Sequence, residues 1–185
     1  MFGYLVKHHR GAGLKGGLPS QFSCMAVQIT QQDVEIAELS LRASTTNLPK
    51  SKRKYVKGRS IYLGVMKGGI STDTLTPHGT LLCEVFNGIL RNYIQELPFE
   101  WCSLVINYNT QSKPHKDSRN KVGLMSVIGA FGSFTGGGDL QFYEADNDEM
   151  VPVGEPIDIH NKLLMFDGRR PVSYTHLTLP TNREV

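Results

Sequence analysis

The sequence predicts a mostly β domain with flanking helices, of the α+β class, in which an antiparallel jelly roll is backed by helices. From residue 101 onward, short apolar runs alternate with Gly-rich or Asn/Asp-rich turns, which is typical of antiparallel sandwiches and barrels. The N-terminal half contains one long segment with apolar residues at three- and four-residue spacing, which indicates an amphipathic helix. With 185 residues, the chain is long enough for one domain with a single sizeable core.

Residues 1–58 are predicted to be a basic, partly disordered N-terminal region. Residues 1–22 are rich in Gly and basic side chains, so we expect them to lack fixed structure. Residues 24–30 have the composition of a short strand, and the dozen residues that follow are compatible with either a helix or a strand. Residues 43–57 are polar and basic and are predicted to form a loop.

The predicted core spans residues 59–171 and begins with a strand at 60–66. The clearest helix comes next; it is expected to begin at Thr80 and to run to Glu96, because Pro98 cannot continue it. Its apolar face is expected to cover one side of the sheet. The later strands are predicted at 101–108, 124–131, 139–144, 155–160 and 162–168.

Composition and charge narrow the class of protein. No stretch approaches the roughly 18 consecutive apolar residues of a membrane helix, and no secretory signal is recognisable. Cys24, Cys83 and Cys102 are scattered and form no CxxC pair, which favours a reducing, intracellular compartment. The basic run Lys50–Arg59 is typical of DNA or RNA contacts and of nuclear import signals. A solvated loop is the alternative, because Tyr55 is the only aromatic residue in the run.

His115 and Asp117 form the most informative pair, two residues apart at the end of a β run. Side chains two residues apart in extended backbone point to the same face, so the imidazole and the carboxylate are presented together. A later histidine would complete a two-His-one-carboxylate set, which holds non-haem iron(II) and leaves three positions open. An HxD pair by itself is a weak signal, since it also occurs by chance in surface loops.

Three ordered segments make the pattern more specific: PHKDSRN at 114–120, GAFGSFTGGGDLQFYE at 129–144 and LLMFDGRRP at 163–171. Together they resemble the double-stranded β-helix core of iron(II)- and 2-oxoglutarate-dependent oxygenases. Within that family they are most similar to the ten-eleven-translocation and J-binding-protein group, which oxidises methyl groups on nucleic-acid bases. The resemblance implies a dioxygenase with iron(II) and 2-oxoglutarate as cofactors, and it covers about residues 100–171.

The resemblance assigns roles only at positions that match. His115 and Asp117 would be the first two iron ligands. Asn107 and Asn109, on the preceding strand, would contact 2-oxoglutarate, although capping of a turn accounts for them equally well. Asn120 would hold the loop that carries Asp117.

The pattern breaks after Pro171. In the family, a histidine that is the third iron ligand follows directly, and an arginine for the far carboxylate of 2-oxoglutarate follows about one strand later. Here residues 172–185 instead resemble translated sequencing-adapter DNA, so they are interpreted as a non-native tail that replaces the closing strands. His176 and Arg183 are the remaining candidates for the third metal ligand and the 2-oxoglutarate arginine. The chain is therefore expected to be truncated and inactive as it stands.

Two alternatives stay open at this point. Prolyl hydroxylases and small-molecule oxygenases share an HxD pair followed by a Gly-rich corner, so the substrate is not determined. A cupin-like jelly roll can also be a binding module without turnover, since two protein ligands seldom hold iron firmly. Salt-sensitive DNA binding would favour oxidation of bases.

Overall fold

The computed structural model describes residues 2–7, 25–44, 48–51, 56–66, 69–93, 103–117, 120, 125–134, 136–146 and 149–174. For residues 2–7, the model describes the backbone only. His176 and Arg183 lie outside the described residues, as do Cys24, Cys102 and positions 52–55 of the basic run.

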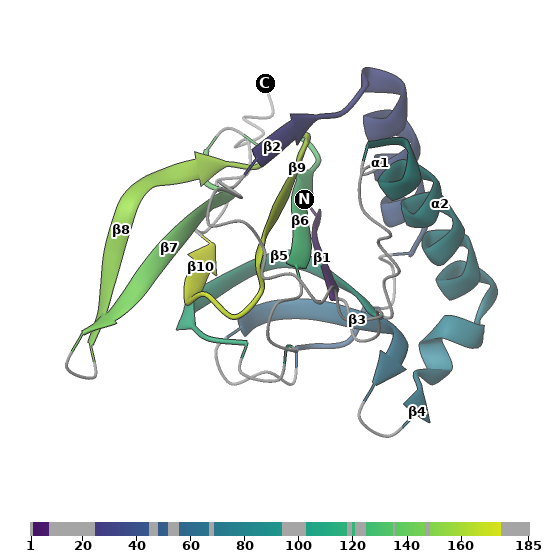
Figure 1. The fold of residues 1–185 in the computed structure, drawn as a ribbon. Coiled ribbons are helices and arrows are strands. Elements are labelled where there is room, and N and C mark those ends of the chain that lie inside the picture. Colours follow the sequence, from purple (N-terminus) through teal and green to yellow (C-terminus); the bar gives the residue numbers. More distant parts are fainter. Residues whose placement is uncertain are drawn as a thin grey trace, which may run out of the picture.

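The described residues form a mostly β fold with two α-helices, which confirms the predicted α+β class (Figure 1). The helices are α1 (Gln31–Ser44) and α2 (Pro77–Tyr93). The strands are β1 (Phe2–Lys7), β2 (Met25–Gln28), β3 (Val56–Met66), β4 (Gly69–Ile70), β5 (Ser103–His115), β6 (Met125–Phe131), β7 (Asp139–Asp146), β8 (Glu149–Asp158), β9 (Lys162–Asp167) and β10 (Val172–Tyr174).

The strands pair antiparallel throughout, in the order β2-β9-β6-β1-β5-β10-β7-β8. The long strand β5 connects the two halves of this order, because one of its edges pairs first with β1 and then with β10. Its other edge pairs with β3. In Figure 1, β7 and β8 extend from one side of the sheet while α1 and α2 cover the other side.

Two hydrophobic cores lie on opposite faces of β5, β6 and β9. Leu163 packs in the core beneath α1 and α2, together with Leu82 and Phe86 of α2. Its neighbour Leu164 packs in the other core, which includes Phe142 of β7. Successive side chains of a strand point to opposite faces, so the central strands are buried on both sides. This double burial explains the nearly continuous apolar runs of β6 and β9.

The ambiguous dozen residues after the first predicted strand form α1. Thr30 caps this helix, because its Oγ1 accepts a hydrogen bond from the Asp33 backbone N–H at 3.2 Å. The Tyr93 hydroxyl of α2 accepts from the Thr30 N–H at 2.8 Å and donates to Asp33 Oδ2 at 2.5 Å. The start of α1 is therefore joined to the end of α2.

The predicted start of the second helix, Thr80, is wrong by one turn. The helix begins at Pro77, and the Thr76 hydroxyl accepts from the Gly79 N–H at 3.0 Å, which satisfies a free donor of the first turn. Proline is well suited to the first helical position, where its missing N–H would have had no helical partner. The described helix ends at Tyr93, before the predicted end.

Strand residues lie at three places where no strand was predicted. Within residues 1–22, the segment 2–7 forms β1 rather than lacking structure, because β5 and β6 supply backbone partners on both sides. Within the predicted loop 43–57, β3 already begins at Val56, so this strand crosses the predicted boundary at residue 58. At the other boundary, β10 belongs to the sheet although it begins the predicted tail. No described helix is long and apolar enough to cross a membrane.

Candidate metal site

The His115 side chain is half-buried at the last residue of β5. Its Nδ1 lies 2.8 Å from the carbonyl oxygen of Lys113. A carbonyl oxygen can only accept, so Nδ1 donates in this contact, which leaves Nε2 as the lone-pair nitrogen of the neutral ring. This is the tautomer that a metal ligand needs, with the second ring nitrogen held by a neighbouring acceptor.

Asp117 lies two residues beyond the strand and is also half-buried. Its carbonyl oxygen accepts a hydrogen bond from the Asn120 N–H at 3.0 Å, which closes a tight turn. The buried Asn120 side chain donates from Nδ2 to the Gly168 carbonyl at 2.8 Å and lies 3.4 Å from Ser126 Oγ. Asn120 therefore ties the loop of Asp117 to the segment after β9.

Val172 lies directly across from His115 in the pairing of β10 with β5. Residues directly opposite on antiparallel strands present their side chains on the same face. The Val172 side chain is 7% exposed and belongs to the core shared by β6, β7 and β9. Valine offers no donor atom, so the position across from the imidazole is apolar. Among the described residues, no three His, Cys, Asp or Glu side chains form a group that could hold a metal ion.

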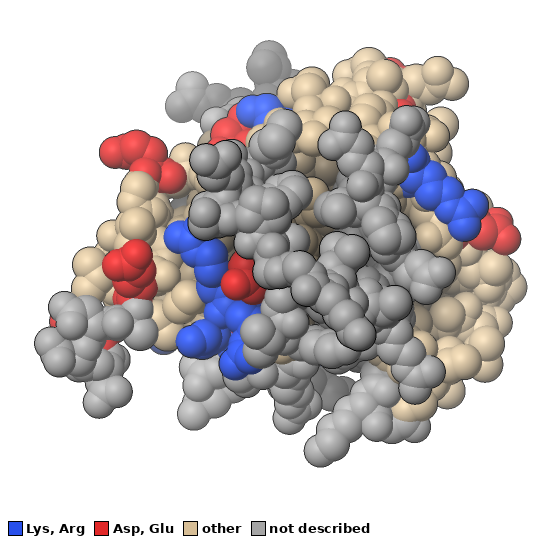
Figure 2. Space-filling model, in the orientation of Figure 1, with Lys and Arg blue, Asp and Glu red and all other residues tan. Residues whose placement is uncertain are grey.

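Arg170 places a positive charge beside Phe142, the residue that pairs with Val172. Its guanidinium carbon lies 4.3 Å above the centre of the Phe142 ring, and Phe142 is the register partner of Val172 on β7. Phe142 is itself buried and meets Phe166 nearly edge-on, with ring centres 5.8 Å apart. Phe142 lies on β7, which is two strands from β5 and His115 in the order β5-β10-β7. Figure 2 shows Lys and Arg side chains gathered over the region where β10 lies in Figure 1.

The two asparagines that were expected to contact 2-oxoglutarate occupy different surroundings. Asn107 is 5% exposed, and its Oδ1 accepts a hydrogen bond from the buried Ser60 hydroxyl at 2.8 Å. It shares a face of β5 with Val105, so it lies on the side of the sheet whose core includes Phe142. Asn109 is exposed and has a φ of 46°, opposite the irregular pairing at Gly58. Asparagine adopts this left-handed backbone conformation more readily than most other residues.

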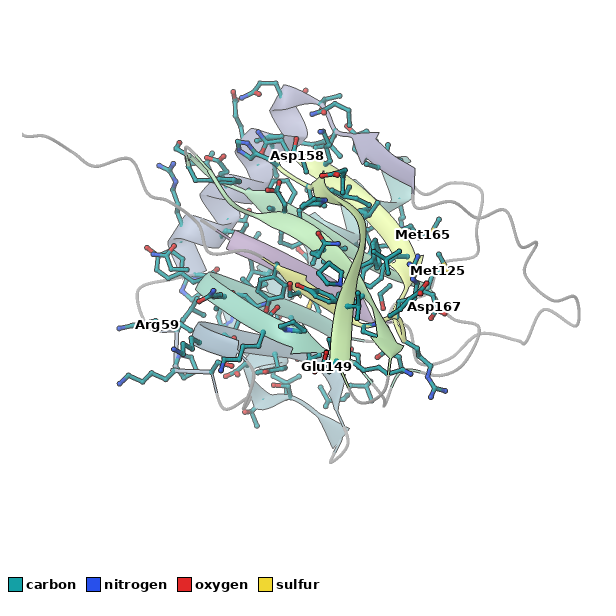
Figure 3. The ribbon with its side chains drawn as sticks, turned by 90° about the vertical axis from the view of Figure 1, so that its left-hand side faces the viewer. Arg59, Met125, Glu149, Asp158, Met165 and Asp167 are labelled. Atoms are coloured by element: carbon teal, nitrogen blue, oxygen red, sulfur yellow. The ribbon has the colours of Figure 1, made fainter. Side chains whose placement is uncertain are left out.

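The described part of the basic run lies away from the end of β9. Lys50, Lys57 and Arg59 are exposed, and Arg59 Nη1 donates to the Leu48 carbonyl at 3.3 Å. Figure 3 shows Arg59 and Asp167 on opposite sides of the molecule. Any phosphate contacts made by this part of the run would therefore be remote from the segment that follows Asp167.

The sequence motifs did not distinguish Arg170 from Arg169, since both belong to the same short segment. The distinguishing feature is that Arg170 reaches Phe142, which is distant in sequence.

Comparison of the chain with family models, with characterised proteins and with solved structures gives no match. The arguments for function therefore rest on the motifs and on the geometry around His115.

Proposed function

We propose that this chain is the core of an iron(II)- and 2-oxoglutarate-dependent oxygenase with valine, at position 172, where the resembled family has its third iron ligand. The observation that carries the proposal is the register of β10 against β5, which sets residue 172 across from His115. The third ligand of the resembled family follows directly after the segment that ends here at Pro171. Sequence order and sheet register thus point independently to the same position.

The strand order supports a double-stranded β-helix for this core. One half of the strand order runs β9-β6-β1-β5, and the other half runs β5-β10-β7-β8. Side chains from both halves meet in one core, in which Ile128 and Leu164 pack with Leu140 and Phe142. A jelly roll likewise encloses its core between two antiparallel sheets.

The residues present fit an iron(II) site in part. His115 Nε2 and the Asp117 carboxylate would hold the metal, and Asn120 would keep the loop of Asp117 in place. When bound, iron(II) with 2-oxoglutarate and dioxygen supplies the oxidation of a substrate C–H bond. Arg170 would offer its fork of N–H donors to an anionic group of the ligand.

The chain as it stands is expected to bind iron weakly and to lack turnover, because valine replaces the third ligand. The decisive variant is Val172→His. With iron(II) and 2-oxoglutarate under anaerobic conditions, this variant is expected to develop the visible charge-transfer band, whereas the unaltered chain is not. Val172→Asn is the matched control, because it also buries a polar side chain but lacks an imidazole.

A second pair of variants tests which side chains act in this site. Adding His115→Ala to Val172→His is expected to abolish the band, while adding His78→Ala, an exposed helix residue, should leave it unchanged. Melting temperatures show whether each variant is folded. A folded Val172→His chain that binds iron no better than Val172→Asn would refute the oxygenase proposal.

Methylated nucleic-acid bases are the proposed substrate, on the basis of the resemblance and of the basic run Lys50–Arg59. Salt-sensitive binding of DNA by the unaltered chain would support this substrate, because phosphate contacts release counterions. Binding that is absent at low salt would favour a prolyl-hydroxylase-like or small-molecule oxygenase. The valine at 172 also favours a second candidate, a cupin-like binding module without turnover.

A further inference from the structure

Two segments that are far apart in the chain meet beside His115. Strand β10 pairs antiparallel with β5, and its first residue, Val172, lies across from His115, the last residue of β5. The residues after His115 therefore approach the residues before Val172. The hydrogen bond from Asn120 Nδ2 to the Gly168 carbonyl, at 2.8 Å, joins the same two segments at a second point. Side chains on these segments thus share one end of the sheet.

The two segments carry four basic side chains. Two lysines lie at the end of β5 and two arginines lie in a turn before β10: Lys113, Lys116, Arg169 and Arg170. The Arg170 N–H closes this turn by donating to the Asp167 carbonyl at 3.0 Å. The lysines are exposed and the arginines are half-buried. Asp117 and Asp167 belong to the same segments, so four basic groups accompany two acidic ones.

Negative charge gathers on the neighbouring arm of the sheet, formed by β7 and β8. Neither strand contains Lys or Arg, and their exposed carboxylates are those of Glu144, Glu149, Glu155 and Asp158. Figure 2 shows acidic side chains over this arm, and Lys and Arg side chains nearer the centre of the same face. A polyanion that approaches this face is therefore repelled by the arm and attracted to the end of β5.

The spacing of the basic groups fits a chain of charges better than a single anion. Lys113 and Lys116 are three residues apart at the end of an extended strand, which corresponds to about 10 Å. A nucleic-acid strand carries one phosphate about every 3.4 Å, so such a row meets several phosphates at once. The guanidinium of Arg169 adds a donor that matches phosphate oxygens with two parallel hydrogen bonds.

We propose that Lys113, Lys116 and Arg169 form a phosphate-binding surface for a nucleic-acid strand that is presented to the site at His115. The inference deepens the proposed function, on which it rests for the reaction at His115. It assigns the phosphate contacts to the end of β5 instead of the basic run Lys50–Arg59. The bound strand runs across the end of β5 and the turn before β10, away from the acidic arm.

The test measures binding of an oligothymidine of about eight nucleotides to the full chain over a range of salt concentrations. Lys116→Gln combined with Arg169→Gln removes two charges from the surface and leaves His115 in place. Because each phosphate contact releases counterions, the slope of log affinity against log salt should fall by about 0.7 for each side chain, with about tenfold weaker binding at low salt. An unaltered chain that does not bind at low salt would refute the surface.

Lys50→Gln combined with Lys57→Gln is the matched control, because it removes two exposed lysines of the basic run and the same net charge. This variant should keep the slope and the affinity of the unaltered chain. Equal losses in the two double variants would show attraction by overall charge and would overturn the proposal. Poly-glutamate that binds as tightly as oligothymidine would overturn the choice of nucleic acid as the partner.

Acetylation of lysines in the unaltered chain gives a readout that does not depend on the folding of a variant. Oligothymidine should protect Lys113 and Lys116 from an acetylating reagent and should leave Lys50 and Lys57 as reactive as before. Protection of Lys50 and Lys57 without protection of Lys113 and Lys116 would contradict the assignment.

Failure of this surface can be distinguished from failure of the proposed function. The charge-transfer band expected for the Val172→His chain should survive Lys116→Gln and Arg169→Gln, since neither side chain would hold the metal. Protection of Lys116 by oligothymidine in a Val172→His chain without the band would refute the oxygenase and support the surface. The band without this protection would refute the surface alone.

Discussion

Around the candidate site, Gly168 is the residue at which an added Cβ atom would have the least room. A Cβ atom there would lie 2.1 Å from Ser126 Oγ and 2.4 Å from Asn120 Nδ2, and both of those side chains are buried. Gly168→Ala is therefore expected to lower the free energy of unfolding by about 1–3 kcal/mol, measured by urea denaturation.

Gly88 provides the matched control for this substitution. It lies in α2, and a Cβ there would meet nothing within 4 Å. Gly88→Ala is expected to stabilise the chain by about 0.5–1 kcal/mol, because alanine loses less conformational freedom in a helix. If both substitutions changed stability equally, the tight contact at Gly168 would be contradicted.

Asp158 gives a prediction about pH. Burial acts to raise the pKa of this carboxyl, but hydrogen bonds from Lys162 Nζ and the His160 N–H, with the charge of Lys162, lower it overall. A carboxyl with a lowered pKa in the folded state stabilises the fold above its unfolded pKa, and this stability is lost as the pH falls through the folded pKa.

Asp158→Asn is accordingly expected to lower stability at pH 7 and to have no effect at a pH below both pKa values. The loss at pH 7 should stay below about 1 kcal/mol, because the Asp158 side chain is 56% exposed and solvent screens the pair. Urea denaturation of both proteins across this pH range measures the difference. A difference that persisted in acid would show that the charge of Asp158 is not its cause.

Around His115, the sequence alone indicated candidate residues but not how they are arranged. His115 and Asp117 stand out because an HxD pair at a strand end has a short-range signature. The tautomer of His115 depends on the Lys113 carbonyl, and the neighbour of His115 across the sheet is Val172. Neither fact follows from local sequence, since one depends on a side-chain rotamer and the other on register.

At the scale of elements, the junction between the helices depends on one hydroxyl. Tyr93 of α2 bonds both Thr30 and Asp33 at the start of α1. Tyr93→Phe is expected to lower the free energy of unfolding by about 0.5–1.5 kcal/mol, because water replaces these hydrogen bonds only in part. Leu39→Ala, at a position of α1 that is 68% exposed, is the control and should have little effect. Equal stability of Tyr93→Phe and the unaltered chain in urea would argue against this junction.

The element predictions succeeded where one periodicity dominates a segment. The strands near β6, β7 and β9 were predicted within a few residues, because alternation or an apolar run marks each of them. The start of α2 was misplaced because Thr76 and Thr80 are both acceptable caps, and only Thr76 meets the Gly79 N–H. Strand β1 was missed because its short apolar run follows no turn signal and precedes a Gly-rich basic segment.

At the scale of the whole molecule, two neighbouring residues of β9 belong to two different hydrophobic cores. Leu163 and Leu164 are both almost fully buried, the first beneath the helices and the second in the core that includes Phe142. Substitution of either leucine by alanine is expected to lower the free energy of unfolding by about 2–5 kcal/mol.

Because β5, β6 and β9 belong to both cores, the molecule is expected to unfold in one step. Circular dichroism and tryptophan fluorescence should therefore give the same midpoint for each variant. Two separate transitions in the Leu163→Ala chain would show that the helical layer unfolds by itself.

The sequence by itself determined the α+β class, the position of most strands and the candidate pair at His115 and Asp117, because hydrophobic periodicity and short motifs are local properties. Only the tertiary structure decided that β1 lies between β5 and β6, that Val172 faces His115 and that Arg170 covers Phe142. These are contacts between segments far apart in the chain. Strand register and order depend on which edges and faces are buried together, and that competition takes place only in the folded molecule.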